Sequence, residues 1–226
     1  MMLLSTRVTL KKQTLKYIFS VEGEAEKMYF EWLEKQICSC EEANYNVKFI
    51  CKVEQNPSQM VKTQNFIYKP DGVIHICDYE SNDEEHIRKF KDTLSKLKKT
   101  SDEINIKYKL GYCNFTFELW MILHKCDCKE SLCHRRQYLT LINKVYNKNF
   151  KSLDHYKKET NFKNLLQELT LENVKEAIKR SFDITEQNRV NGLSLQEHCK
   201  YKFYKENPSL SIGEIIHEIL KKCGLF

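Results

Sequence analysis

Apolar and polar positions alternate between strand-like and helix-like patterns in the first half of the chain. The strand-like runs are rich in β-branched and aromatic residues and comprise residues 16–21 (KYIFSV), 47–53 (VKFICKV), 72–77 (GVIHIC) and 104–113. A segment with helical spacing or a helix-start signal follows each run, beginning with residues 26–37. Four strands, each followed by a helix, predict a parallel α/β sheet of about four strands, with right-handed crossovers and helices on both faces.

Capping signals place two of the helices in this half. Asn56-Pro57 supplies an N-cap and a first-position proline for a helix that runs to about residue 68. Asn82 and Glu85 have the spacing of a capping box, and an apolar face from Ile87 to Leu97 follows them.

From about residue 135 the pattern is helical. Thr170 is suited to cap a helix that runs toward Val190, and Ser211 with Glu214 forms a capping box for the final helix. The apolar stripe of that final helix comprises Ile212, Ile215, Ile216, Ile219 and Leu220. We therefore expect an α/β domain over residues 1–134 and a helical region over residues 135–226 packed on it.

Acidic and amide side chains follow three of the predicted strands. Glu22 follows the first strand, Asp78 and Glu80 follow the third, and Asn114 follows the fourth. Ligands of open α/β sheets bind outside the carboxyl ends of the strands, and oxygen ligands suit Mg²⁺ or Mn²⁺. The pattern predicts a metal site formed by Glu22, Asp78 and Glu80, of a kind useful in phosphoryl chemistry. The alternative is that these acids solvate strand ends or cap the next helices.

Other residues near these strand ends have two interpretations each. Glu118 lies in the first turn after the fourth strand, where it either faces the site or caps the helix. His124 is either a hydrogen-bonded histidine at a helix end or a proton-transfer group. Asn114 either holds a carboxylate or contacts phosphate. Trp120 shares an apolar stripe with Phe117 and is expected in the core.

Charge and cysteine content narrow the class of protein. The net charge of +6 favours a polyanionic partner without establishing one. The ten cysteines are expected to be reduced, because the N-terminal apolar run is too short for a signal peptide. No apolar stretch approaches the roughly 18–20 residues of a membrane span, so we expect a cytoplasmic protein with no membrane contact.

Two further clusters have candidate chemistry. Zinc is unlikely, because the potential ligands lack paired Cys-x-x-Cys spacing; they are His124, Cys126, Cys128, Cys133 and His134. The helical half contains basic residues interleaved with aromatic ones, which is typical either of a nucleic-acid surface or of amphipathic helices with core aromatics. The best candidates there for substrate contacts are Lys157, Lys158 and Arg180.

Two segments resemble the signatures of the RloB family of bacterial phage-defence proteins. Residues 21–30 (VEGEAEKMYF) are similar to the opening signature EG-x-x-TE-x-x-YF, and residues 114–124 (NFTFELWMILH) are similar to SNPxFELWLLLH. Residues 206–212 (ENPSLSI) carry a weaker likeness. The two motifs stand in the family's order, with an acidic strand end between them.

This family is similar to Toprim domains, in which a glutamate after the first strand and a D-x-D after the third organise metal-dependent phosphodiester chemistry. The resemblance implies that Glu22 is the first-strand glutamate and that Asp78 and Glu80 take the D-x-D positions. Glu26 matches the second family acid, whereas Ala25 replaces the family threonine. Glu80 replaces the second aspartate, and we expect it to keep metal binding while changing the geometry.

The resemblance implies a Mg²⁺- or Mn²⁺-dependent nuclease that acts in abortive phage defence. The candidate catalytic residues are Glu22, Asp78, Glu80, Glu26, Glu118 and His124. An ABC-type ATPase encoded nearby is implied as a partner, and the chain itself has no G-x-x-x-x-G-K-[ST]. Analogy slightly favours RNA, including tRNA, over DNA. The alternative is a non-catalytic nucleic-acid or nucleotide-binding subunit, and the oligomeric state stays open, a homo-oligomer included.

Overall fold

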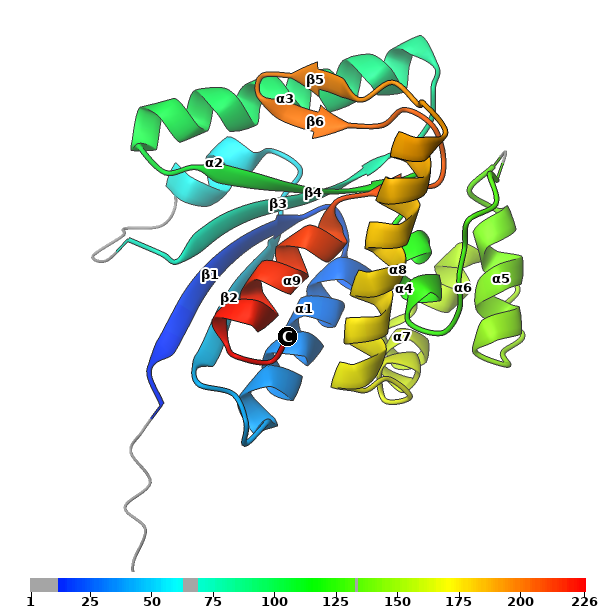
Figure 1. Ribbon diagram of the computed structural model, residues 1–226, viewed down its shortest axis with the longest axis horizontal. Coiled ribbons are helices and arrows are strands. Elements are labelled where there is room, and N and C mark those ends of the chain that lie inside the picture. The colour runs from blue at the N-terminus through cyan, green and yellow to red at the C-terminus, as the bar shows by residue number, and fades with distance from the viewer. Residues whose placement is uncertain (1–11, 63–68, 133) are drawn as a thin grey trace, which may run out of the picture.

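The computed structural model describes residues 12–62, 69–132 and 134–226. A five-stranded sheet has the strand order β2-β1-β3-β4-β7 (Figure 1). Its strands are β1 (Thr14–Val21), β2 (Asn46–Val53), β3 (Gly72–Tyr79), β4 (Tyr108–Asn114) and β7 (Ser209–Leu210). The four long strands are parallel, as predicted, and β7 pairs with the end of β4 in the antiparallel direction.

Helices cover both faces of the sheet, because residues along each strand point alternately to the two faces. Phe19 and Ile74 pack on the face that carries α1 (Glu24–Ser39) and α9 (Ile212–Lys222). Ile18 and Val73 pack on the opposite face, beneath α2 (Pro57–Lys62) and α3 (Glu84–Ile104). Figure 1 shows these two layers of helices on either side of the sheet.

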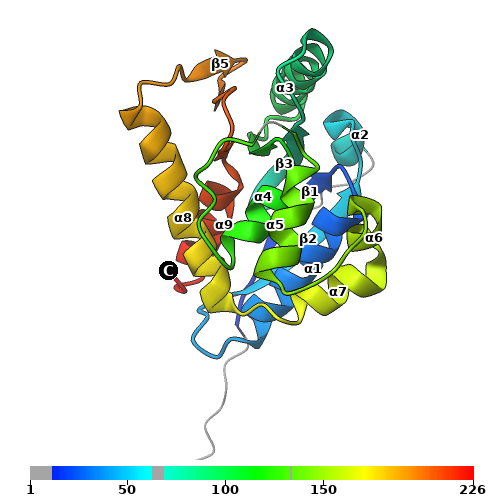
Figure 2. The ribbon, with the colours of Figure 1, turned by 90° about the vertical axis from the view of Figure 1, so that its right-hand side faces the viewer.

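The remaining helices form a group beside α1. They are α4 (Glu118–Leu123), α5 (Gln137–Val145), α6 (Leu153–Lys157), α7 (Glu159–Leu166) and α8 (Leu171–Val190). In Figure 2, α7 lies against the side of α1 and α6 packs on α7, while α4 lies between α5 and α8. This arrangement carries α6 to the end of the sheet at which β1 and β3 finish.

Local signals predicted several boundaries correctly. Asn56 accepts a hydrogen bond from the backbone N–H of Ser58 at 3.3 Å and so caps α2. The predicted continuation of that helix over residues 63–68 lies outside the described residues. Thr170 caps α8 in a reciprocal capping box with Asn173. The stripe of five residues predicted for α9 is buried.

Two capping predictions and one strand boundary were wrong. Asn82 accepts a hydrogen bond from the Tyr79 hydroxyl, so Asp83 caps α3 instead. Ser211 uses its hydroxyl to bond the backbone of β4 and leaves α9 without a side-chain cap. The strand predicted over residues 104–113 begins at Tyr108, because α3 continues to Ile104 and ends at Asn105 in the left-handed conformation (φ 51°).

Three short strands in the C-terminal part were not predicted. The strands β5 (Gln196–His198) and β6 (Tyr201–Phe203) form a hairpin beside α3, and β7 joins the main sheet. Segments of two or three residues are too short to show periodicity. The division of the chain at residue 134 stays a prediction.

Candidate functional site

The sheet brings Glu22 and Asp78 together. Glu22 follows the last residue of β1, and Asp78 is the penultimate residue of β3. Because β1 and β3 pair in parallel, both carboxyl groups lie at the same edge of the sheet. The Glu22 carboxylate accepts a hydrogen bond from the backbone N–H of Asp78, with an N–O distance of 3.2 Å. These two predicted ligands therefore form the centre of the site.

Two buried glutamates join this pair from helix starts. Glu26 lies in the first turn of α1 and is 4% exposed, and Glu118 is the first residue of α4 and is 0% exposed. The Thr116 hydroxyl donates a hydrogen bond to Glu118. Glu26 Oε2 has no hydrogen-bond partner among the described residues. A Cβ atom at Gly23 would lie 2.8 Å from that oxygen, so the glycine makes room for the carboxylate.

Lys157 is the cation that the described residues place among these carboxylates. It is the last residue of α6, and its Nζ lies 3.0 Å from Glu118 Oε1. Burial lowers its pKa, but the attraction of Glu118, Glu26 and Asp78 outweighs this effect, and the net pKa is raised. The sequence predicts that Lys157 contacts substrate. The structure places it as the internal counter-ion of the cluster.

The carboxyl groups hold protons more tightly than isolated acids do. Burial, followed by repulsion from Glu26 and Glu80, raises the pKa of Glu22 to about 7. Burial and the neighbouring acids raise the pKa of Asp78 well above its ordinary range, and burial also raises the pKa of Glu26. Clustered acids near neutrality either share protons or attract a cation. A site of this kind fits a divalent cation.

Glu80 lies near Glu22 and Asp78 but pairs with basic side chains. Its carboxylate lies 2.6 Å from His86 Nε2 and 3.9 Å from an Arg135 nitrogen. Within the described ranges, no three His, Cys, Asp or Glu side chains are arranged to hold one metal ion. Mg²⁺ keeps several waters and commonly uses one or two carboxylates, so Glu22 and Asp78 suit it without a third protein ligand.

A cavity of about 490 Å³ opens beside Glu22, Asp78 and Glu80. Its opposite wall is formed by α3, which contributes Lys89 and Lys96. These two lysines are seven residues apart and therefore lie on the same helix face. Sequence reasoning missed this wall, although the spacing of the lysines was visible. The same helix also lines the cavity with Asp92, and Lys89 pairs with Glu85 at 2.7 Å, so the α3 side of the cavity has mixed charge.

The structure places His124 and Asn114 in supporting positions. His124 Nδ1 donates to the Trp120 carbonyl at 2.9 Å, so Nε2 accepts from the Tyr29 hydroxyl at 3.0 Å. Burial lowers the pKa of His124 to about 3, which keeps the ring neutral. The Asn114 amide donates to the carbonyls of Lys205 and Glu206 at 2.8 and 3.2 Å. The position of His124 matches the hydrogen-bonded interpretation, whereas Asn114 contacts backbone carbonyls, and its predicted contact with a carboxylate or a phosphate stays a prediction.

Neither of the other two predicted substrate contacts forms an ion pair with these carboxylates in the described part of the chain. Arg180 donates to the Leu123 carbonyl at 2.6 Å and pairs with Asp127 at 3.2 Å, at the C-terminal end of α4. Lys158 is exposed next to Lys157. Trp120 is fully buried, as predicted. The roles proposed for Arg180 and Lys158 stay predictions.

The potential zinc ligands are only partly described. Cys133 lies outside the described residues. Cys128 is buried, Cys126 is half-buried, and His134 is exposed and accepts a hydrogen bond from the backbone N–H of Arg136.

The chain belongs to the RloB-like protein family, whose model matches residues 17–219. This match confirms the resemblance inferred from the two sequence motifs. The search of curated proteins and the search of solved structures found no match. Among the described helices, none is long and apolar enough to cross a membrane.

Proposed function

We propose that this protein is a metal-dependent nuclease with a Toprim-like site that cuts phosphodiester bonds in nucleic acid. The observation that carries the proposal is the cluster of Glu22, Asp78, Glu26 and Glu118, with raised pKa values at the first three. Glu22 and Asp78 of this cluster line the open cavity. A surface with only a structural role has little reason to gather buried carboxylates whose charged forms are destabilised.

Glu22 and Asp78 would hold Mg²⁺ or Mn²⁺, because they are the two acids joined directly at the sheet edge. When bound, the ion supplies Lewis acidity and neutralises charge on phosphoryl oxygens. Glu26 and Glu118 set the negative potential of the site, and Lys157 moderates it. Lys96, and Lys89 beside its partner Glu85, would attract the phosphate backbone.

Membership of the RloB-like family supports a defence-associated role. In this proposal the chain is the effector, and a partner ATPase licenses cleavage. RNA, including tRNA, is the first substrate to test. The test incubates purified protein, with and without the ATPase, with labelled tRNA, single-stranded DNA and duplex DNA in Mn²⁺. Asp78→Asn is the inactive comparison, and Asp127→Asn is a matched control because Asp127 pairs with Arg180 instead. No cleavage by the wild type under any condition would refute the proposal.

A second candidate function is a non-catalytic nucleic-acid-binding subunit. It is favoured by the position of Lys157, whose Nζ already supplies positive charge to the carboxylates. In that case the site needs no metal. Isothermal titration with Mn²⁺ separates the two functions, since the nuclease requires heat of binding that Asp78→Asn removes, whereas the binding subunit shows none.

A further inference from the structure

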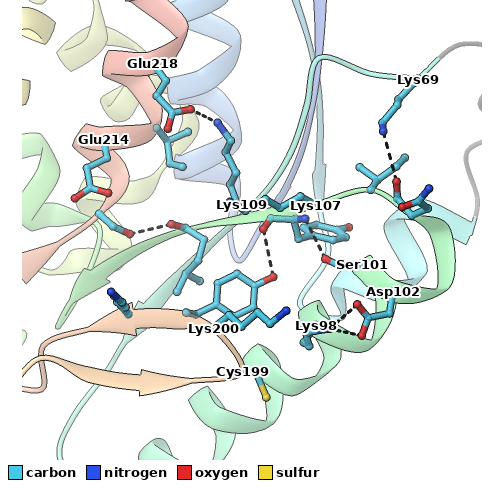
Figure 3. Close-up of a pocket in the computed structure, with 18 residues that line it drawn as sticks. Lys69, Lys98, Ser101, Asp102, Lys107, Lys109, Cys199, Lys200, Glu214 and Glu218 are labelled. Carbon is cyan, nitrogen blue, oxygen red and sulfur yellow. Dashed lines mark hydrogen bonds and ion pairs between the residues drawn. The ribbon is translucent and has the colours of Figure 1, made fainter.

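A second and larger cavity lies near the opposite end of the sheet. It has a volume of about 810 Å³ and is bounded by the start of β4, the last turns of α3, the β5–β6 hairpin and the first turns of α9 (Figure 3). It begins beside Tyr108, which pairs with Val73 near the start of β3, whereas Asp78 lies near the end of that strand. A rise of about 3.3 Å per residue puts the two positions more than about 15 Å apart. The lining reaches Leu110, opposite His75, and shares no residue with the cavity beside Glu22 and Asp78, so the two cavities are separate.

The walls of this cavity are basic, with six lysines against three acids. Two of the lysines form ion pairs within the wall, Lys98 with Asp102 and Lys109 with Glu218. These pairs neutralise the charges of two of the three acidic side chains. The remaining charge on the wall is positive.

Four lysines supply that remaining charge. Lys69, Lys107, Lys200 and Lys202 are exposed, and none forms an ion pair among the described residues, although Glu197 lies opposite Lys202 across the hairpin. They come from three separate places, namely the approach to β3, the approach to β4 and the β5–β6 hairpin. Glu214 is the acid left to oppose them, and burial raises its pKa. We call this cavity, with these four lysines, the lysine groove; one of them, Lys69, donates to the Asn105 carbonyl at 3.5 Å.

The hairpin holds its lysines at the rim of the groove. Cys199 and Lys200 form the two-residue turn and both have positive φ, at 52° and 71°, a conformation that favours glycine or asparagine. The hairpin is tied to α3 by a contact of 2.9 Å between Ser95 and His198. It is tied to β4 by the Tyr201 hydroxyl, which donates to the Tyr108 carbonyl at 3.3 Å. Lys200 is thus fixed over the groove in a strained turn.

The arrangement suits an extended polyanion better than one compact phosphate. A compact phosphate needs converging donors, commonly at a helix N-terminus. Here α3 presents its C-terminal end to the groove, and that end carries partial negative charge. The first turn of α9 also reaches the groove, but it carries the acidic Glu214. Lysines spaced around an open groove instead match charges repeated along a polymer, and the half-buried Tyr201 ring offers a surface for an unpaired base.

We propose that the lysine groove binds the phosphodiester backbone of a nucleic-acid strand at a distance from the carboxylate site. The choice of nucleic acid as the polyanion rests on the proposed function. The presence of the groove and its positive charge do not depend on the proposed function.

The test measures binding in metal-free buffer with EDTA, by fluorescence anisotropy of labelled 20-nucleotide single-stranded RNA and DNA. The test variant is Lys107→Glu/Lys200→Glu/Lys202→Glu. The matched control, Lys35→Glu/Lys144→Glu/Lys151→Glu, makes the same change of charge at exposed lysines outside the groove. Circular dichroism checks that both variants are folded.

We expect the groove variant to bind at least tenfold more weakly than the control. The slope of log K against log salt should also fall in magnitude by about two, because each of the three lost contacts to a single-strand phosphate contributes roughly 0.7. Equal affinities of the two variants would overturn the proposal, as would a wild type that binds neither oligonucleotide. Groove-dependent binding to phosphatidylserine vesicles but not to RNA or DNA would also overturn it. Since cleavage is not measured, binding through the groove by a protein that never cuts would refute the proposed function alone.

Discussion

Replacement of Lys157 by methionine tests whether the carboxylate cluster depends on its internal cation. The variant leaves Glu118, which is fully buried, without the ion pair that joins Lys157 Nζ to Glu118 Oε1 at 3.0 Å. At an effective dielectric constant of about 20, a pair at this distance attracts by about 5 kcal/mol before desolvation is subtracted. Loss of one partner of a buried pair typically costs about 3–5 kcal/mol. Because Lys157 is 28% exposed, we expect the lower end, about 3 kcal/mol.

Urea denaturation at pH 8, followed by tryptophan fluorescence, measures this loss. Lys158→Met is the matched control, because Lys158 is exposed, and it should change the free energy of unfolding by less than about 0.5 kcal/mol. The double variant Lys157→Met/Glu118→Gln should recover most of the loss, since removal of both charges leaves no unpaired ion.

The loss should shrink at low pH. Raised pKa values at Asp78 and Glu26 mean that the cluster takes up protons readily once its cation is gone. The difference between wild type and Lys157→Met at pH 5 should therefore be smaller than at pH 8. The reasoning fails if Lys157→Met is within about 0.5 kcal/mol of the wild type at pH 8, or if the double variant is no more stable than the single one.

Three further outcomes test the site and the packing around it. The pKa of Glu22 rises on folding from 4.5 to about 7, so its contribution to stability is present below pH 4.5 and is lost as the pH rises through 7. Glu22→Gln should remove this pH-dependent loss of stability, which is worth up to about 3 kcal/mol. Free energies of unfolding that change in parallel for the two proteins between pH 5 and 8 would contradict this expectation. In thermal unfolding, Mn²⁺ at a hundredfold excess over Kd should stabilise the wild type by about 2.7 kcal/mol, and Asp78→Asn should abolish this effect. Unchanged stabilisation of the variant would argue against Asp78 as a metal ligand. Gly213→Ala places a Cβ 1.9 Å from Ser181 Oγ, between α9 and α8, and should cost about 1–3 kcal/mol in urea denaturation. Adding Ser181→Gly should restore part of this loss, and a fully stable Gly213→Ala would show that the helices separate freely.

Local interactions made part of the fold predictable. The capping box at Thr170 involves residues three positions apart, and the stripe on α9 repeats with the helical period. Where a side chain had a distant partner, local reasoning failed. Ser211 forms its hydrogen bonds with β4, about a hundred residues earlier in the chain, and therefore does not cap α9.

The sequence by itself determined that Glu22 and Asp78 stand at the ends of parallel strands, because apolar runs stop there. The tertiary structure placed β1 beside β3, which brings the two acids together. Only the tertiary structure decided which other charges join them. Helix α6 brings Lys157 to Glu118, whereas Glu80 forms an ion pair with His86. These contacts depend on how separate helices pack. Periodicity along one segment carries no information about that packing, since the contacting residues lie on different elements.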